Sequence, residues 1–222
     1  MTGDDVLRTV VGPVREFDRR DLAAHPARAA TALLGALLVR DDPTAASGVV
    51  LARIVETEAY REDEAASHSH RGRTARTEPM FRRPGTAYVY RSYGVHWCCN
   101  VAAEADGLGS AVLLRAAVVL DGSAAVAARR PTARHPEQLL RGPGNLAAGL
   151  DIDGPRHDRG DLVAGVAGVR LAQDDWRPQP TRVVCGPRVG VSAASELPWR
   201  RFLADVPEVS AYRRSPRAAP AR

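Results

Sequence analysis

Hydrophobic and polar positions follow different periods in different parts of the chain. Residues 23–39 carry an apolar face at helical spacing, with Pro26 near the start where proline is tolerated, so they predict a helix. Residues 48–60 are rich in valine and isoleucine and predict a strand. Residues 86–91 and 95–102 alternate as strands around Ser92-Tyr93-Gly94, which is the signal of a compact hairpin.

Weaker patterns complete the set of predicted elements. Further strands are expected at residues 111–120 and 183–191, and short helices at residues 123–129 and 145–150. Residues 61–84 have no clear period and are interpreted as an ordered functional loop.

The two ends of the chain carry little regular pattern. Residues 1–20 are expected to be a loosely packed lead-in, and residues 213–222 a basic, disordered tail. The whole predicts an α+β fold: a single mixed domain over residues 1–212, with a mostly antiparallel curved sheet, surrounding helices and a protruding β-hairpin.

The charge of the chain favours an acidic partner such as nucleic acid. The formal net charge is +5, and the sequence contains no lysine, so all 31 basic residues are arginine. Arginine suits bidentate contact with phosphate, although an ordinary basic cytosolic protein would carry a similar net charge. A hydrophobic content of 45% in 222 residues supports one folded core.

Cysteine content and hydropathy indicate the compartment. Cys98, Cys99 and Cys185 give neither a disulfide framework nor a metal-binding C-x-x-C spacing. The longest apolar run, near residues 33–39, is too short to cross a bilayer, and the N-terminus lacks an apolar signal core. We therefore expect a soluble, cytoplasmic, nucleoid-associated protein that has no membrane contact.

A pair of carboxylates on the strand at residues 48–60 is the first candidate for chemistry. Glu56, Glu58 and Tyr60 alternate on one face, which places the carboxylates roughly 7 Å apart. Such a pair can serve as acid and base in hydrolysis of a glycosidic bond. The alternative is that both acids simply pair with arginines on a solvated face.

The hairpin tip and the following loops suggest contact with DNA. Tyr93 at the turn is either a wedge for a base stack or a residue that folds back onto the protein body. Five arginines lie within thirteen residues near one acid, Glu78, and suggest either a phosphate-binding surface or a solvated loop: Arg71, Arg73, Arg76, Arg82 and Arg83. His68 and His70 have H-x-H spacing without an evident third ligand, and we expect no metal and no cofactor.

Many ordered motifs between residues 22 and 210 resemble the alkyladenine DNA glycosylase family, also called the 3-methyladenine DNA glycosylases. They include L-L-G, E-T-E-A-Y, A-S-H, R-G-R-T-A-R-T, P-G-T-A-Y-V-Y, Y-G-V-H-W-C-C-N, L-L-R, G-P-G-N-L and R-V-G-V. The sequence departs from the family at Asn145, where a lysine is expected, and at Cys99, where a bulky apolar residue is expected.

The resemblance implies a role for eight residues. Glu58 matches the general base that activates water, and Arg115 and the main-chain carbonyl of Val189 match the groups that hold that water. The residues that enclose the flipped base are Tyr60, His68 and Tyr90. Asn100 matches the position that excludes guanine, and Tyr93 the residue that fills the gap in the duplex. Glu56 receives no catalytic part.

The implied activity is excision of alkylated or deaminated purines from double-stranded DNA by a monomer. The expected substrates are 3-methyladenine, 7-methylguanine, hypoxanthine and ethenoadenine. Because strand-cleaving glycosylases commonly use an amine nucleophile and this chain has no lysine, we expect a monofunctional enzyme that leaves an abasic site. The alternatives are a catalytically silent protein that recognises distorted duplex, and a carbohydrate hydrolase that uses Glu56 and Glu58.

Overall fold

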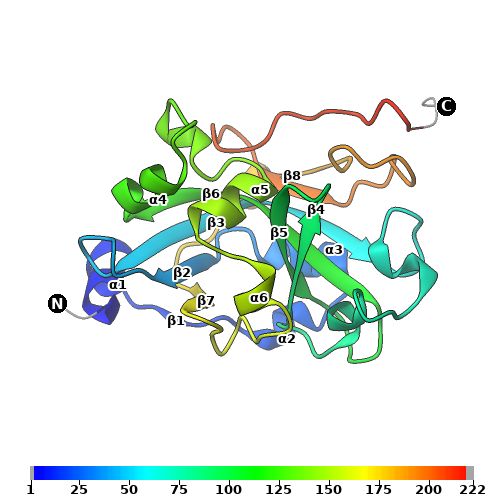
Figure 1. The fold of residues 1–222 in the computed structure, drawn as a ribbon, viewed down its shortest axis with the longest axis horizontal. Coiled ribbons are helices and arrows are strands. Elements are labelled where there is room, and N and C mark those ends of the chain that lie inside the picture. The colour runs from blue at the N-terminus through cyan, green and yellow to red at the C-terminus, as the bar shows by residue number, and fades with distance from the viewer. Residues whose placement is uncertain (1–2, 219–222) are drawn as a thin grey trace.

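The computed structural model describes residues 3–218 and has one nine-stranded sheet at its centre (Figure 1). Neighbouring strands follow the order β1-β7-β2-β3-β6-β5-β4, with β9 paired to β3 and β8 paired to β9. The strands are β1 Arg15–Glu16, β2 Leu37–Asp41, β3 Val49–Arg61, β4 Ala87–Ser92, β5 His96–Ala102, β6 Ser110–Asp121, β7 Val169–Gln173, β8 Val183–Gly186 and β9 Arg200–Leu203. All of their pairings are antiparallel, which confirms the predicted α+β class.

Short helices surround the sheet. The α-helices are α1 Gly3–Val11, α2 Arg19–Leu22, α3 Pro26–Ala32, α4 Ser123–Arg129, α5 Pro143–Gly149 and α6 Gly154–His157. The 3₁₀ helices are η1 His68–Arg71, η2 Glu78–Phe81, η3 Pro136–Gln138 and η4 Pro180–Arg182. Within residues 3–218, no helix has the length and apolar content required to cross a membrane.

The 13-residue strand β3 is the element on which the rest is built. One of its edges pairs with β6 along most of its length. The other edge pairs with β2 over its first half and with β9 over its second half. Because both edges are hydrogen-bonded, the side chains of β3 are held at fixed positions.

The prediction of one helix over residues 23–39 is wrong in its second half. Helix α3 ends at Ala32, and the chain then enters strand β2. Between them lies Gly35 at φ +87, where a Cβ atom would approach the ring of Trp176 to 2.6 Å. A short apolar run does not distinguish a buried helix from a strand that is covered on both faces.

Two other predictions need correction. Residues 1–20 were expected to be loosely packed, but α1 buries Val6 and Leu7. The strand expected over residues 183–191 ends at Gly186, and the residues after it form a loop. Of the predicted basic tail, residues 213–218 have no helix or strand, and residues 219–222 lie outside the described part.

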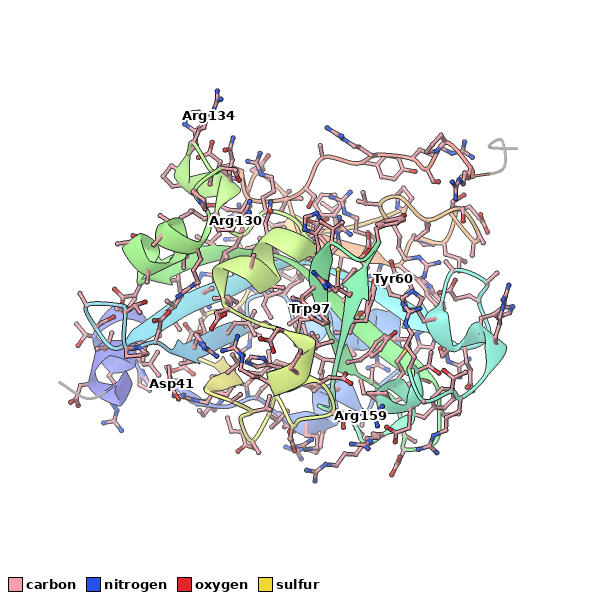
Figure 2. The ribbon with its side chains drawn as sticks, in the orientation of Figure 1. Asp41, Tyr60, Trp97, Arg130, Arg134 and Arg159 are labelled. Carbon is pink, nitrogen blue, oxygen red and sulfur yellow. The ribbon has the colours of Figure 1, made fainter. Side chains whose placement is uncertain are left out.

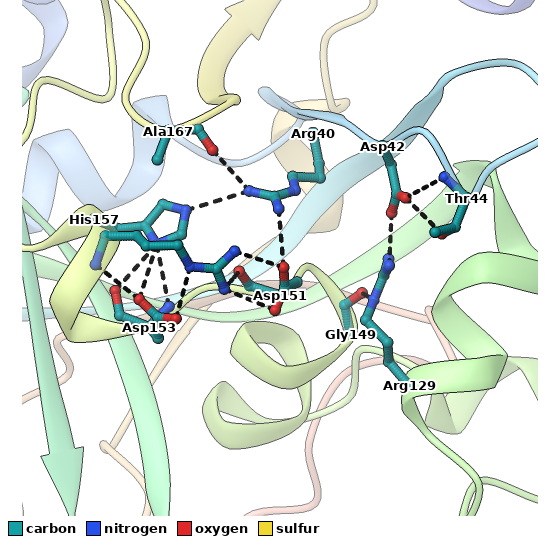
Figure 3. Close-up of polar contacts among 10 residues, drawn as sticks. Arg40, Asp42, Thr44, Arg129, Gly149, Asp151, Asp153, His157 and Ala167 are labelled. Atoms are coloured by element: carbon teal, nitrogen blue, oxygen red, sulfur yellow. Dashed lines mark hydrogen bonds and ion pairs between the residues drawn. The ribbon is translucent and has the colours of Figure 1, made fainter.

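Ion pairs attach the short helices to the strand β2. Arg40 of β2 donates to Asp151 at 2.9 Å and to the carbonyl of Ala167 at 2.8 Å (Figure 3). Arg129 of α4 lies 2.7 Å from Asp42, just beyond the end of β2. These contacts join α4 and the turn after α5 to the sheet. Beyond α4 the chain projects outwards, and Arg134 points away from the body (Figure 2).

Candidate active site

Glu58 lies in the second half of β3, where the strand is paired on both edges. It is opposite Leu113 of β6 and Arg200 of β9. Its side chain is completely buried, so its charge must be compensated by partners within the protein. The pairing therefore fixes the position of an acid that solvent does not reach directly.

Three donors hold the carboxylate of Glu58. Its Oε2 accepts from the Tyr60 hydroxyl at 2.8 Å and from Arg115 Nη1 at 3.2 Å. Its Oε1 accepts the backbone N–H of Val189 at 2.7 Å. A carboxylate offers about four acceptor sites, so the hydrogen bonds from the described residues leave one site on Oε1.

Glu56 forms the second half of a buried charge network. Its Oε1 accepts from Arg115 Nε at 3.0 Å and from Arg200 Nε at 2.7 Å. Because Arg115 contacts both acids, the two carboxylates lie on the same side of β3, as strand alternation predicts. The alternative of a solvated face is wrong, since both acids are fully buried.

Arg115 and Tyr60 keep their protonation states near neutral pH. Burial lowers the pKa of Arg115, but the carboxylates of Glu58 and Glu56 outweigh burial and raise it above its usual value. Burial and the neighbouring Glu58 raise the pKa of Tyr60 well above 10. Its phenol therefore stays protonated and acts as a hydrogen-bond donor to Glu58. Arg115 therefore stays cationic and Tyr60 stays neutral at physiological pH.

A cavity of about 520 Å³ opens beside these residues. Seven of the eight predicted site residues line it: Tyr60, His68, Tyr90, Tyr93, Asn100, Arg115 and Val189. The eighth, Glu58, lies behind Tyr60, Arg115 and Val189 and contacts all three. In Figure 2, Tyr60 lies in the half of the molecule that carries the hairpin β4–β5. The structure thus brings together the eight residues to which the resemblance assigns a role.

Aromatic side chains form one wall of the cavity. The rings of Tyr88 and Tyr90, alternate residues on β4, are stacked with centroids 5.2 Å apart. His68 of η1 meets Tyr90 edge-on at 4.6 Å, and its Nδ1 lies 3.0 Å from the Tyr88 hydroxyl. Asn100 on the neighbouring strand donates to the Tyr88 carbonyl at 3.0 Å, which fixes its amide at the wall.

His68 is a neutral part of this wall. Burial, and then the nearby positive charge of Arg76, lowers the pKa of His68 from 6.5 to about 4. Arg76 also lies over the Tyr90 ring, 5.4 Å from its centroid. His68 therefore offers one donor and one acceptor nitrogen at neutral pH.

Arg188 lies against Tyr60 and was not predicted as a site residue. It is fully buried and pairs with Glu64 at 2.6 and 2.9 Å. Its guanidinium lies 4.6 Å from the centroid of the Tyr60 ring, a distance at which a cation and an aromatic face attract. Motif R-V-G-V contains Arg188, but nothing in the sequence indicates its partner Glu64.

Tyr93 stands at the tip of the hairpin. Tyr93 and Gly94 both have positive φ, 50° and 69°, and the N–H of Val95 donates to the Ser92 carbonyl at 3.0 Å. This is the geometry of a two-residue type I′ turn. The Tyr93 side chain is 95% exposed, so the alternative that the tip folds back onto the body is wrong.

The arginine-rich loop is more internally paired than the sequence suggested. Arg73 and Arg82 both pair with Glu78, at 3.1 and 2.7 Å. Arg83 pairs with Asp161 at 2.6 Å, an acid distant in sequence. Of the five arginines, Arg76 is the one that lines the cavity.

The remaining candidate residues have structural surroundings. Within residues 3–218, no group of three or more histidine, cysteine, aspartate or glutamate side chains is placed to hold a metal ion. Cys99 is buried in the main core, whereas Cys98 lines the cavity, as expected for neighbours on a strand. Asn145 donates to the carbonyl of Arg141 at 2.7 Å and so stabilises the start of α5.

Comparison with known proteins agrees with this arrangement. The sequence profile of the methylpurine-DNA glycosylase (MPG) family matches residues 20–207. A protein of Nocardia farcinica (strain IFM 10152) is 48% identical over 206 residues, covering 89% of this chain and 92% of that protein. A protein of Mycobacterium tuberculosis (strain H37Rv) is 47% identical over 213 residues, covering 93% and 98%. Both are named "Putative 3-methyladenine DNA glycosylase". The buried acid, the aromatic cavity and these matches lead to one conclusion: the chain belongs to the methylpurine-DNA glycosylase family.

Proposed function

We propose that this protein is a monofunctional DNA glycosylase that removes alkylated or deaminated purines from double-stranded DNA. The observation that carries the proposal is the position of Glu58, a buried carboxylate with one remaining acceptor site, behind an aromatic cavity with an exposed tyrosine at its mouth. The substrates are 3-methyladenine, 7-methylguanine, hypoxanthine and ethenoadenine. A single subunit, acting as a monomer, supplies every group required.

Binding begins with the DNA backbone and ends with one nucleotide outside the stack. Exposed arginines contact phosphates without reading the sequence. Tyr93 then enters the duplex from the hairpin tip and occupies the place of the extruded nucleotide. This contact offsets the few kcal/mol that unstacking costs. Damaged or mispaired bases leave the stack at a lower cost, which provides a first stage of selection.

The cavity provides a second stage of selection. Its volume of about 520 Å³ is in the range of small-molecule sites and accommodates one purine. Tyr60, His68 and Tyr90 enclose the base, and aromatic faces favour electron-poor, alkylated rings. The amide of Asn100, fixed by its hydrogen bond to Tyr88, crowds the exocyclic amine of guanine and excludes it.

Glu58 supplies the chemistry. A water molecule donates a hydrogen bond to Oε1 of Glu58, and Arg115 and the main-chain carbonyl of Val189 also hold it. As the N-glycosidic bond breaks, its electron pair leaves with the base and the water oxygen bonds to C1′. The proton released by water passes to Glu58. The carboxylate also stabilises the positive charge that develops on the sugar, while Arg115 holds Glu58 in position.

The product is an abasic site in an unbroken strand. Cleavage of the strand by a glycosylase commonly passes through a Schiff base with an amine. The sequence contains no lysine, so no lysine amine is available for this step. The water-derived hydroxyl therefore remains on C1′.

The test is direct detection of the released base. Duplexes that each contain one modified purine are incubated with the full-length protein, and free base is measured by mass spectrometry. We expect release of 3-methyladenine and hypoxanthine and retention of normal purines. Tight binding to the same duplexes without any release would instead support the rival function, a catalytically silent protein that recognises distorted DNA.

A further inference from the structure

The segment after β9 lies against the active-site loop. We call residues 207–213 the C-terminal arm. The arm has no helix or strand, and in Figure 1 its red trace runs beside the orange trace of the loop at residues 187–192. The match to the family profile ends at residue 207, where the arm begins.

Contacts with the body of the protein hold the arm. Val206, just before it, and Val209 pack against an apolar cluster that includes Leu203. Arg141 donates to the Pro207 carbonyl, and Arg200 Nη2 donates to the Ser210 carbonyl at 2.5 Å. These contacts fix the path of the main chain over the buried charge network.

The first link between the arm and the active site is Ser210. Its backbone N–H donates to Oε2 of Glu56 at 2.8 Å. The other oxygen of Glu56 is shared by Arg115 and Arg200. Because a buried carboxylate needs donors on both oxygens, the arm completes the surroundings of the acid that orients Arg115.

The second link is Arg213. Its carbonyl accepts the backbone N–H of Gly190 at 2.9 Å. The preceding residue, Val189, donates its own N–H to Glu58 at 2.7 Å. Two successive backbone N–H groups of one loop are thus hydrogen-bonded, that of Val189 to Glu58 and that of Gly190 to the arm.

We propose that the C-terminal arm is a positioning element of the active site. It holds Arg115 through Glu56, and it holds the Val189 donor through Gly190, so that two of the three partners of Glu58 are placed before DNA binds. This inference rests on the function proposed above for Glu58. A displacement of catalytic partners by about 1 Å can reduce a rate by about 100-fold.

Two variants remove one link each. Ser210→Pro removes the N–H that contacts Glu56, and its matched control Ser210→Ala keeps it; the Ser210 hydroxyl has no hydrogen-bond partner among the described residues. A chain that ends at Ala211 removes the acceptor of the Gly190 N–H, and its control ends at Ala218. A third control, Arg213→Ala/Arg214→Ala/Arg217→Ala, keeps the main chain but removes three positive charges.

The measurement is single-turnover excision at saturating DNA, with thermal unfolding as a check that each variant is folded. We expect Ser210→Pro and the chain ending at Ala211 to excise roughly 10- to 100-fold more slowly than their controls. The triple arginine variant should bind more weakly at low salt yet excise faster than the chain ending at Ala211. Hydrogen exchange at Gly190 should increase when the chain ends at Ala211.

The possible outcomes separate this inference from the proposed function. If the full-length protein releases no base, the proposed function fails. If the full-length protein is active, and both folded variants match their controls in rate and in exchange at Gly190, the arm has no positioning role. If the triple arginine variant is as slow as the chain ending at Ala211, the arm acts by charge, which also overturns the inference. Replacing Glu56 by glutamine should reduce the difference between Ser210→Pro and Ser210→Ala.

Discussion

Replacing Glu58 with glutamine tests the mechanism most directly. The glutamine has nearly the same shape, but it has one acceptor oxygen and an amide that donates. Its oxygen can accept either from Val189 or from the pair Tyr60 and Arg115, which approach opposite ends of the side chain. The amide nitrogen of the glutamine then points at the remaining N–H or O–H donors and cannot accept a hydrogen bond from them. Arg115 retains Glu56 as its only carboxylate partner among the described residues.

The substitution affects the activation free energy of excision and the free energy of unfolding by different amounts. A positioned general base contributes about 10²- to 10⁴-fold to a rate, which corresponds to about 3–5.5 kcal/mol of activation free energy. A buried donor that loses its acceptor costs about 1–3 kcal/mol of unfolding free energy. For a chain of this size that lowers the Tm by roughly 2–4 °C per kcal/mol. Glu58→Gln should therefore remain folded at 25 °C but be nearly inactive.

The assay compares Glu58→Gln with Glu56→Gln in single-turnover release of hypoxanthine at saturating duplex. Glu56 is the matched control because it lies on the same strand, is equally buried and contacts the same Arg115. Glu56→Gln should be destabilised at least as much, because it also contacts Arg200, but it should excise faster than Glu58→Gln because Glu56 acts only through Arg115. A Glu58→Gln protein that excises at more than a tenth of the unaltered rate, or is no slower than Glu56→Gln, would refute the assignment of the base.

Four further outcomes are expected. Tyr93→Ala should slow single-turnover excision roughly tenfold or more, since unstacking costs a few kcal/mol, while Tm and non-specific binding stay unchanged because the side chain is 95% exposed; an unaltered rate would remove its wedge role. Asn100→Ser should gain activity on guanine-containing mismatches, and no gain on such duplexes counts against exclusion by crowding. Gel analysis without added base or endonuclease should show intact strands, whereas cleavage would contradict a monofunctional enzyme. NMR titration of His68 should give a pKa of about 4. Because this pKa lies below 6.5, the contribution of neutral His68 to stability is present above pH 6.5 and is lost as the pH falls towards 4. A titration midpoint near 6.5 would show that His68 is not held neutral in the cavity wall.

Elements whose signal is local were predicted well from the sequence. The hairpin β4–β5 was predicted from the strand patterns on either side of Ser92-Tyr93-Gly94, and the structure has positive φ at Tyr93 and Gly94, as a tight hairpin turn requires. Helix α4 at residues 123–129 was predicted with its observed bounds. Elements whose identity depends on distant partners were not. The strand β2 is apolar on both faces because α1 and the main core cover it, and its sequence is compatible with a helix.

The same division applies to the active site. The face of β3 that carries Glu58 and Tyr60 follows from a period of two, and the structure places Tyr60 in the cavity wall with Glu58 hydrogen-bonded behind it. Several groups that hold this part of β3 come from the C-terminal third of the chain, and no spacing indicates them: Arg188 against the Tyr60 ring, and Arg200 and the main chain of Ser210 on Glu56. Main-chain donors leave no trace in a sequence, since every residue except proline carries one.

The burial of four charges beneath the cavity has a physical rationale. Two acids, Glu56 and Glu58, are matched by two guanidiniums, Arg115 and Arg200, and burying such a group is costly unless every member is paired. Arginine remains protonated at any physiological pH, and the raised pKa of Tyr60 keeps its phenol neutral. The partners of Glu58 therefore present the same charge and the same hydrogen-bond directions throughout the physiological range. A field that is fixed before the base arrives needs no reorganisation as positive charge develops on the sugar, and that is the condition under which a buried carboxylate stabilises a transition state most strongly.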